Sequence, residues 1–465
     1  MPVKRTTLKS VLLHRVFVSL IAFLFLLVAG CSTQEPESFQ EAPAITSLPT
    51  NTPVPTPFPG GLYVDGGFSL GPISPLVYGT NYGPWLGISL EIQPTLKELG
   101  LTYIRFPGGH WGDTNETTKP QIDLLMYFAN EWGATPSISV RLPDSTPEEA
   151  AEMVRYVNLE KGYNVRYWSI SNEANLFDQE KTLFPDGYKS EQFNQEWREF
   201  ALAMKAVDPN ILLVGPDVSQ FIPHPTASYG QSFIDWLTSF LKVNGDLIDI
   251  VAIHRFPFPA GTHNGPPTKD ELRNHSKEWD ELVPALRTLV HETTGRDLPL
   301  AITEVNSSWA VNVGGEATMD SHYNAIWWAD SLGRMIRQDV TIVAQFAVTG
   351  QFGMTGKYDI YPMAYVYSLY KQFGAEEIYT STDIPFVSIY AARREDSSLT
   401  LMIVNLKSEM VNTTLSLENA QTGIAETWLL DPTHSAEQTD STPVGAATPL
   451  TLTPESVTLL VLPQN

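Results

Sequence analysis

Short apolar runs alternate with longer amphipathic stretches from about residue 75 to residue 373. The short runs have the length and the continuous hydrophobicity of strands that are buried on both faces. The longer stretches repeat apolar residues at helical spacing, and strands that alternate with helices predict a parallel sheet. The expected strands are Leu76–Thr80, Thr102–Phe106, Pro136–Val140, Val165–Ser171, Ile211–Gly215, Leu247–Ile253, Leu300–Thr303 and Thr341–Val348.

Eight strands in alternation with helices predict the α/β class and, within it, a (β/α)8 TIM barrel over residues 61–375. An open doubly wound sheet is the alternative, but no glycine-rich phosphate-binding turn follows any of these strands. Helices are expected at Thr146–Gly162, Ser190–Asp208 and His322–Gln338. The first begins with Ser145-Thr-Pro-Glu-Glu149, and a proline with acids in the first turn is typical of a helix start.

The pattern changes after Gly374, where the apolar runs become short, β-rich and separated by turn residues. This pattern predicts a small antiparallel β-sandwich over residues 376–465, and the stretch 61–72 ahead of the barrel could add a strand to it. The expected strands are Phe386–Ala392, Leu399–Leu406, Asn412–Leu417, Ala425–Leu430 and Val457–Leu462.

Residues 1–30 resemble a bacterial lipoprotein signal peptide, which is cut before a cysteine that then carries lipid. An apolar run, Val16–Gly30, leads directly into Cys31, the only cysteine. An uncleaved membrane anchor is the alternative, but this run is shorter than the roughly 20 residues that a spanning helix needs. We therefore expect lipid attachment at Cys31 and an extracytoplasmic protein anchored to a bacterial membrane. The basic residues before the run are Lys4, Arg5, Lys9 and Arg15.

Residues 31–60 are expected to form a tether, because the segment is rich in proline and threonine and holds no lysine or arginine.

The net charge of the chain is −23 at pH 7, which disfavours nucleic acid as a partner. No metal-binding His-Glu-x-x-His helix, P-loop or Gly-x-Ser-x-Gly elbow is present, and the histidines are scattered. The sequence therefore predicts neither a metal nor another cofactor.

Two glutamates end apolar runs, Glu173 in Trp168-Ser-Ile-Ser-Asn-Glu173 and Glu304 in Leu300-Ala-Ile-Thr-Glu304. If these runs are parallel barrel strands, both carboxylates project from the C-terminal ends of the strands, where barrel active sites lie. Two carboxylates at that face can act on one glycosidic bond, one as proton donor and one as nucleophile. Either glutamate alone could also be an ordinary acid at a strand end.

Polar residues at other strand ends could support such a pair. Arg105 ends the second strand, where it could pair with a carboxylate, although a structural ion pair is the alternative. His254 ends the sixth strand and could orient a carboxylate or a sugar hydroxyl, although a buried histidine is usually structural. Asn172 precedes the first glutamate, and its amide could bind a substrate hydroxyl.

The chain resembles glycoside hydrolase clan A, and most of all the family 51 α-L-arabinofuranosidases and their relatives. That resemblance implies a TIM barrel, with Glu173 as acid/base, Glu304 as nucleophile, and Arg105, Asn172 and His254 as supporting residues. It also implies an oligo- or polysaccharide substrate. The matching stretches are Tyr78-Gly79, Arg105-Phe-Pro-Gly-Gly109, Thr146-Pro-Glu-Glu-Ala-Ala151, Tyr167-Trp-Ser-Ile-Ser-Asn-Glu173, His254, Thr303-Glu304-Val-Asn306 and Ala344-Gln345.

Three positions depart from the family pattern around the expected sugar site. Asn81-Tyr-Gly83 stands where the family usually has a sugar-binding Glu, His110 where it has Asn, and Phe256 where it tends to have Tyr. We therefore expect arabinofuranosides to be poor substrates, with a pyranoside or an oligosaccharide preferred. Further candidates for sugar contacts are Asn306, Trp85, Trp111 and Trp309, although the tryptophans could equally cap the barrel core.

The sequence thus favours an extracellular retaining glycosidase with a two-carboxylate mechanism. One alternative is a catalytically silent carbohydrate-binding lipoprotein. Another is an enzyme of the same clan with a different specificity, such as a xylosidase, glucanase or glucuronidase, because the same pair of acids cuts many sugars.

Overall fold

The computed structural model describes residues 59–464, apart from 182, 226–227, 260–262, 264 and 311–312. The expected signal peptide, Cys31 and nearly all of the expected tether lie outside the described residues. Within them, no helix combines the length and the apolar character needed to cross a membrane.

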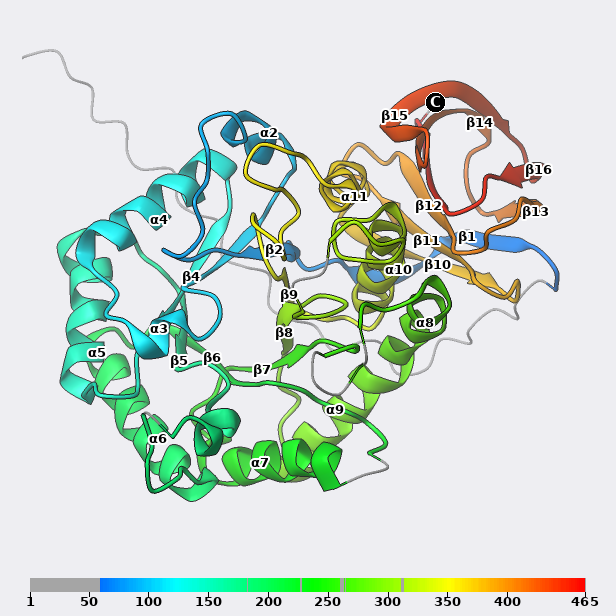
Figure 1. Cartoon of the computed structure of the whole chain (residues 1–465). Helices are drawn as coiled ribbons and strands as arrows, with labels where there is room; N and C mark the ends of the chain where they lie inside the picture. The colour runs from blue at the N-terminus through cyan, green and yellow to red at the C-terminus, as the bar shows by residue number, and fades with distance from the viewer. Residues whose placement is uncertain are drawn as a thin grey trace, which may run out of the picture. The chain divides into compact units, whose positions relative to one another are not determined.

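Eight parallel strands form a closed barrel, in which each strand pairs with the next along the chain and β9 returns to β2 (Figure 1). Each of the eight expected strands overlaps one of them, so the predicted TIM barrel is confirmed. Because the strands are parallel, their C-terminal ends meet at one face. The strands are β2 (Leu76–Asn81), β3 (Tyr103–Phe106), β4 (Thr135–Val140), β5 (Tyr167–Ile170), β6 (Leu212–Val218), β7 (Ile250–Arg255), β8 (Leu300–Val305) and β9 (Ile342–Gln345).

Helices follow the strands, and in several cases local capping fixes where a helix begins. At the start of α5 (Pro147–Val154), the Thr146 hydroxyl accepts a hydrogen bond from Glu149 N at 3.2 Å, as the sequence signal indicated. The other helices that follow barrel strands are α2 (Gln93–Glu98), α3 (Trp111–Thr114), α4 (Lys119–Trp132), α6 (Ser190–Val207), α7 (Ser228–Asn244), α8 (Lys269–His275), α9 (Trp279–Thr294), α10 (His322–Arg337) and α11 (Pro362–Tyr370).

A second, mostly antiparallel sheet of nine strands follows the barrel. The predicted C-terminal β domain is confirmed. Its strands form one hydrogen-bonded sheet in which β1 joins two parts, and residues from across the sheet share one hydrophobic core. β1 pairs antiparallel with β10 on one side and parallel with β13 on the other. The order is β15-β14-β17-β12-β11-β10-β1-β13-β16. The bounds are β1 (Leu62–Pro72), β10 (Glu376–Thr382), β11 (Val387–Arg393), β12 (Leu399–Asn405), β13 (Val411–Glu418), β14 (Gly423–Asp431), β15 (His434–Val444), β16 (Ala447–Leu452) and β17 (Ser456–Leu462).

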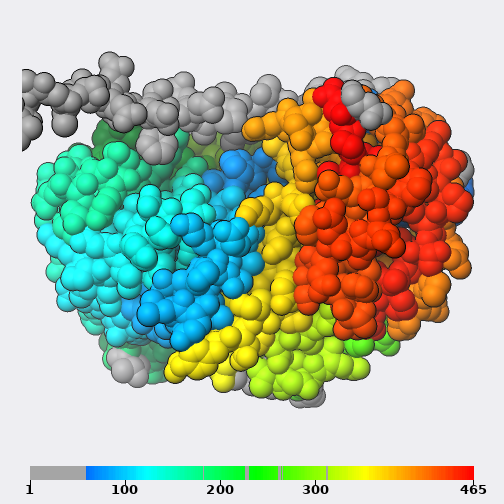
Figure 2. All heavy atoms as spheres, turned by 90° about the horizontal axis from the view of Figure 1, so that it is seen from above, coloured from blue at the N-terminus to red at the C-terminus, as the bar shows by residue number. Residues whose placement is uncertain are grey.

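The sheet packs against the barrel through α10 and α11. Figure 2 shows the yellow part of the chain, which includes α11, between the blue and cyan barrel segments and the orange and red strands. At the contact with α10, the Tyr390 hydroxyl of β11 donates to Asp330 Oδ1 at 2.6 Å. A Cβ on Gly333, one turn further along α10, would lie 2.5 Å from the Tyr390 ring. The missing side chain at Gly333 is therefore what allows this close approach.

Replacing Gly333 by alanine should lower the free energy of unfolding. Alanine favours a helix by about 1 kcal/mol over glycine. Its methyl group, however, must displace a ring that Asp330 holds, and overpacking of this kind typically costs about 1–3 kcal/mol or more. We expect a lower urea midpoint for Gly333→Ala. The control is Gly423→Ala, where a Cβ would meet nothing within 4 Å. Equal midpoints for Gly333→Ala and the unchanged protein would contradict this packing argument.

Candidate active site

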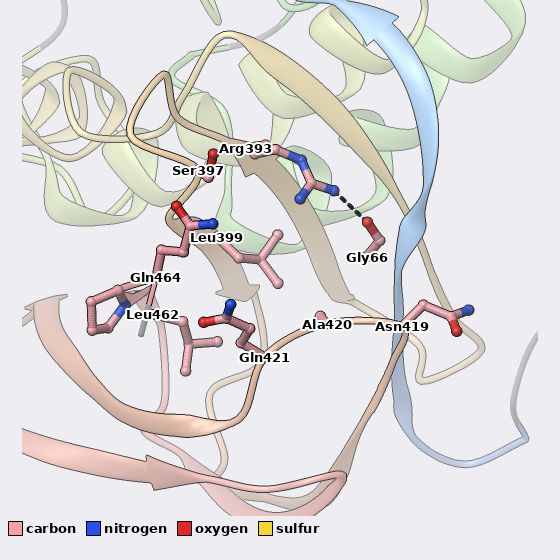
Figure 3. Close-up of a pocket in the computed structure, with 10 residues that line it drawn as sticks. Gly66, Arg393, Ser397, Leu399, Asn419, Ala420, Gln421, Leu462 and Gln464 are labelled. Carbon is pink, nitrogen blue, oxygen red and sulfur yellow. Dashed lines mark hydrogen bonds between the residues drawn. The ribbon is translucent and has the colours of Figure 1, made fainter.

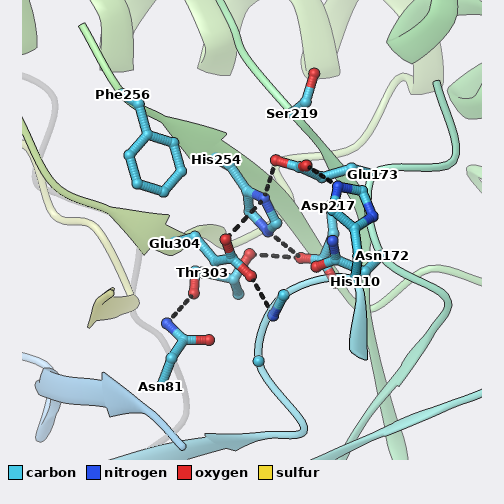
Figure 4. Close-up of polar contacts among 12 residues, drawn as sticks. Asn81, His110, Asn172, Glu173, Asp217, Ser219, His254, Phe256, Thr303 and Glu304 are labelled. Atoms are coloured by element: carbon cyan, nitrogen blue, oxygen red, sulfur yellow. Dashed lines mark hydrogen bonds and ion pairs between the residues drawn. The ribbon is translucent and has the colours of Figure 1, made fainter. Parts of the chain in front are cut away.

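The two glutamates singled out in the sequence lie together at the C-terminal face of the barrel (Figure 4). Glu304 belongs to β8, and Glu173 follows β5. An oxygen of each carboxylate and a nitrogen of His254 all lie within 4.8 Å of one another. Both glutamates are buried, with 8% of Glu173 and 3% of Glu304 exposed. The barrel thus brings two carboxylates to a separation at which both can reach one bond.

A sharp turn of the backbone aims Glu173 inward. Ser171 and Glu173 both have positive φ angles, of 68° and 48°. Glu173 N donates to Asp217 O at 3.2 Å, which ties this turn to the end of β6. Non-glycine residues in this region of φ are uncommon, and they concentrate at functional sites where the surroundings hold them in place.

Glu304 is bound by a cation and a backbone donor. Its Oε1 accepts from Arg105 Nη1 at 2.6 Å and from Gly109 N at 2.8 Å. Its Oε2 lies 3.6 Å from His254 Nδ1, because His254 and Glu304 are paired across β7 and β8. These contacts fix the carboxylate and match the negative charge of an ionised glutamate.

Arg105 is fully buried and connects four polar groups. Besides Glu304, Nη1 donates to Asn81 Oδ1 at 3.1 Å, while Nη2 donates to Asn172 Oδ1 at 2.8 Å and to Asp217 Oδ2 at 3.2 Å. Burial alone would lower the pKa of Arg105, but the charges of Asp217 and Glu304 raise it. The guanidinium is therefore a permanent cation inside the barrel mouth.

Each oxygen of Glu173 contacts a histidine. Oε1 lies 2.8 Å from His254 Nδ1, and Oε2 lies 3.0 Å from His110 Nε2. Burial would raise the pKa of Glu173, but the bonds to His110 and His254 lower it well below its usual range. In turn, burial opposes a charge on either imidazole, and Glu173 together with its acidic neighbours raises both histidine pKa values to about 9. Because the His110 side chain is 46% exposed, water screens its pairing more than that of fully buried His254.

Two further acids complete the network, and the sequence analysis missed both. Asp217, in β6, is 1% exposed and accepts from Thr303 Oγ1 at 2.5 Å as well as from Arg105. Burial would raise the pKa of Asp217, but Arg105 and His254 lower it to about 2. Asp113, in α3, accepts from Ser171 Oγ at 3.0 Å and Asn172 N at 2.9 Å, and burial raises its pKa to about 7. Asp217 was missed because the sixth strand was expected to end at Gly215.

The remaining predicted residues divide into those inside this network and those beside it. Asn81 and Asn172 lie inside it as acceptors for Arg105. Asn306 instead holds a loop, because its Nδ2 donates to Phe346 O at 2.7 Å and to Phe352 O at 3.0 Å. Trp111 is half-buried on α3 beside Asp113.

An aromatic wall, defined as Trp85, Phe256, Trp309, Phe346 and Phe352, lies beside the carboxylates. Trp85 stacks on Phe346 with ring centroids 5.6 Å apart. Phe256 contacts Phe346 and Trp309 edge-on at 6.0 and 5.8 Å. In Figure 4, the Phe256 ring lies on the side of His254 that is turned away from His110. At the position where the resembled family tends to have a tyrosine, Phe256 thus presents an apolar ring without a hydroxyl.

The same carboxylates could be considered as metal ligands, since Glu173, His254 and Glu304 converge. However, Arg105 already places a positive charge 2.6 Å from Glu304. A divalent cation would have to bind next to that guanidinium, so the charge balance favours chemistry by the carboxylates themselves.

A separate hollow of about 500 Å³ lies in the nine-stranded sheet (Figure 3). Among the described residues that line it, Arg393 is the only charged one, and its guanidinium contacts Gly66 O. These described residues include no acid, so they supply neither a proton donor nor a carboxylate nucleophile.

No protein-family model matches the chain. A curated relative, the intracellular exo-α-(1→5)-L-arabinofuranosidase of Streptomyces lividans, is 25% identical over 223 residues. This match covers 38% of the chain and 31% of the relative, so the chain spans about a third of the relative's length.

Solved structures match almost the whole described chain. The α-L-arabinofuranosidase of Thermotoga maritima superposes with a TM-score of 0.71 at 17% identity, over 87% of this chain and 100% of the other. A family 44 xyloglucanase of Paenibacillus polymyxa superposes with a TM-score of 0.69 at 16% identity, over 88% of this chain and 100% of the other. The fold is that of clan A glycoside hydrolases. These relatives and structural neighbours are all glycoside hydrolases, but their names cover different sugars.

The histidine pKa values predict how stability depends on pH. Folding raises the pKa of His110 and His254 from 6.5 to about 9, so the native state binds their protons more tightly than the unfolded chain does. This stabilisation is complete below about pH 6.5 and is lost as the pH rises through about 9. The free energy of unfolding, from urea titrations, should therefore fall between these values. His254→Asn should weaken the dependence, whereas His224→Asn, whose side chain is 79% exposed, should leave it unchanged. Stability that rises over this interval would contradict the assignment.

Proposed function

We propose that the protein is a retaining glycosidase in which Glu173 is the acid/base and Glu304 the nucleophile. The observation that carries the proposal is the approach of the two carboxylates, in which one oxygen of Glu173 and one oxygen of Glu304 lie within 4.8 Å of each other. Carboxyl groups about 5–5.5 Å apart belong to retaining enzymes, whereas inverting enzymes keep about 6.5–9.5 Å for an attacking water.

In the first step, Glu304 Oε2 attacks the anomeric carbon, and Glu173 gives a proton to the departing oxygen. Arg105 and Gly109 N hold Oε1, so that the second oxygen is left for attack. The product is a glycosyl-enzyme ester on Glu304. In the second step, Glu173 removes a proton from water, which attacks the same anomeric carbon and restores the original configuration.

The histidines account for the proton that this cycle needs. With His110 and His254 both donating, Glu173 is ionised, so the proton for the leaving group resides on a neighbouring imidazole. His110 is the half-exposed member of the cluster and lies 3.0 Å from Glu173. In the proposed cycle, substrate binding weakens the bonds that lower the pKa of Glu173, and His110 then passes its proton to Glu173 and recovers one from solvent afterwards.

The substrate we propose is an extracellular glycan, reached by an enzyme anchored through lipid at Cys31. This part rests on the lipoprotein-like residues 1–30 and the proline-rich segment that follows. A catalytically silent binding protein is the rival from another class. It gives no reason for two buried carboxylates that share one histidine, and absence of turnover with any glycoside would favour it.

Retention of configuration is the direct test of the proposed mechanism. With an aryl glycoside that the enzyme turns over, ¹H NMR should show the first-formed hemiacetal with the anomeric configuration of the substrate, before mutarotation. The reason is that two successive inversions at one carbon cancel. First appearance of the opposite anomer would overturn the assignment of Glu304 as nucleophile.

The two glutamates should differ in how their loss depends on the leaving group. Glu304→Ala should abolish turnover of every substrate. Glu173→Ala should retain much more activity on aryl glycosides with acidic leaving groups than on natural glycans, because such groups leave without a proton donor. Azide should then rescue Glu173→Ala and give a glycosyl azide of retained configuration. Equal losses on both kinds of substrate, without rescue, would contradict these roles. Glu377→Gln, which changes a buried acid of β10, is the control.

A further inference from the structure

Gly83 and Trp85 lie just after β2, in direct contact with each other. A Cβ on Gly83 would lie 2.6 Å from Trp85 Nε1 and 2.9 Å from Trp85 Cδ1. Even alanine at position 83 would thus displace the indole. The glycine and the tryptophan are therefore one unit, in which the absence of a side chain at 83 makes room for the ring at 85.

The indole is fixed by two contacts. Trp85 Nε1 donates to Gly108 O at 3.1 Å, and the ring stacks on Phe346 with an angle of 30° between the planes. Nevertheless, Trp85 is 37% exposed, the highest exposure of the tryptophans among the described residues. An exposed indole held in a fixed orientation loses little conformational freedom when a ligand packs on it.

Trp85 also lies close to the residues that hold the Glu304 carboxylate. Its partner Gly108 precedes Gly109, whose backbone N–H holds Glu304 Oε1 at 2.8 Å. A Cβ on Gly109 would lie 3.4 Å from the Phe346 ring on which Trp85 stacks. The indole therefore belongs to the rim next to the nucleophile, on the same face of the barrel.

We propose that Trp85 is a specificity-determining platform that receives the apolar face of a pyranose ring. This inference rests on the proposed glycosidase function. A glutamate at position 83 would select sugars by hydrogen bonds to hydroxyls, whereas an indole selects flat faces of C–H groups. A pyranose chair with equatorial hydroxyls presents such faces, and a puckered furanose presents them less well. Phe256 also favours contact with C–H groups over hydrogen bonds to sugar hydroxyls, since its side chain has no hydroxyl.

Variants of Gly83 and Trp85 test the platform through their coupling. Steady-state kinetics are measured on aryl β-xyloside, β-glucoside, β-galactoside and α-L-arabinofuranoside. We expect the unchanged enzyme to prefer a pyranoside. Trp85→Ala should raise the KM for that pyranoside by about 10-fold, with kcat much less affected, since losing one apolar contact costs roughly 10–200-fold in discrimination. The KM for the arabinofuranoside should rise less, so the ratio of kcat/KM for the pyranoside to kcat/KM for the arabinofuranoside should fall.

Gly83→Ala should reproduce the effect of Trp85→Ala, because its methyl group displaces the indole. In the Gly83→Ala/Trp85→Ala double variant, the second change should add nothing, which is the signature of two residues that act together. Gly87→Ala is the matched control in the same loop, where a Cβ meets nothing within 4 Å. Additive effects, equal losses on all four substrates, or an unchanged KM in Trp85→Ala would overturn the platform. So would a preference of the unchanged enzyme for the arabinofuranoside.

A binding measurement separates this inference from the proposed function. Xylo- and cello-oligosaccharides are titrated into the Glu304→Gln variant while tryptophan fluorescence is recorded. Quenching should be lost in Glu304→Gln/Trp85→Phe and kept in Glu304→Gln/Trp428→Phe, where Trp428 lies in β14. If the fluorescence quenching depends on Trp85 but the unchanged protein hydrolyses none of the glycosides, the platform is supported and the proposed glycosidase function is rejected. Turnover of pyranosides without any Trp85-dependent quenching would reject the platform and leave the glycosidase standing.

Discussion

A buried positive charge organises the mouth of the barrel. Arg105 is fully enclosed, and a guanidinium without partners in such a place would cost several kcal/mol. The surrounding strands therefore have to supply acceptors, and they do so from β2, from the turn after β5, and from β6 and β8. The contact with Glu304 neutralises the buried cation and at the same time fixes the position of this candidate nucleophile. The pairing of the buried charge therefore also sets the geometry of the site.

The barrel and its two central acids could be predicted from sequence because both depend on local patterns. Buried parallel strands give continuous apolar runs, and a polar residue that ends such a run must lie at the common face. Glu173, Glu304, Arg105 and His254 all follow this rule, and the structure brings the four together. Alternation of strands and helices then leaves few ways to close the sheet.

Other features depend on contacts between distant segments, which no local pattern encodes. β15, His434–Val444, was missed because it is an edge strand with polar side chains on both faces, and among the described strands it pairs only with β14. Asp217 was missed because a strand that continues past Gly-Pro carries no apolar signal. The pairing of Gly83 with Trp85 was also hidden, since the position of an indole depends on Gly108 and Phe346, far along the chain.

The place of β1 has a consequence for the order in which the protein can be completed. β1 is made before the barrel, yet it pairs with β10 and β13, which are made after it. During synthesis the backbone hydrogen-bonding groups at both edges of β1 have no strand partners while some 300 residues emerge, and β10 and β13 pair with them only afterwards. The sheet thus links the first described strand to strands from the C-terminal part of the chain by hydrogen bonds. A cut at the end of the barrel, where the sequence pattern changes, would divide this sheet rather than separate two independent folding units.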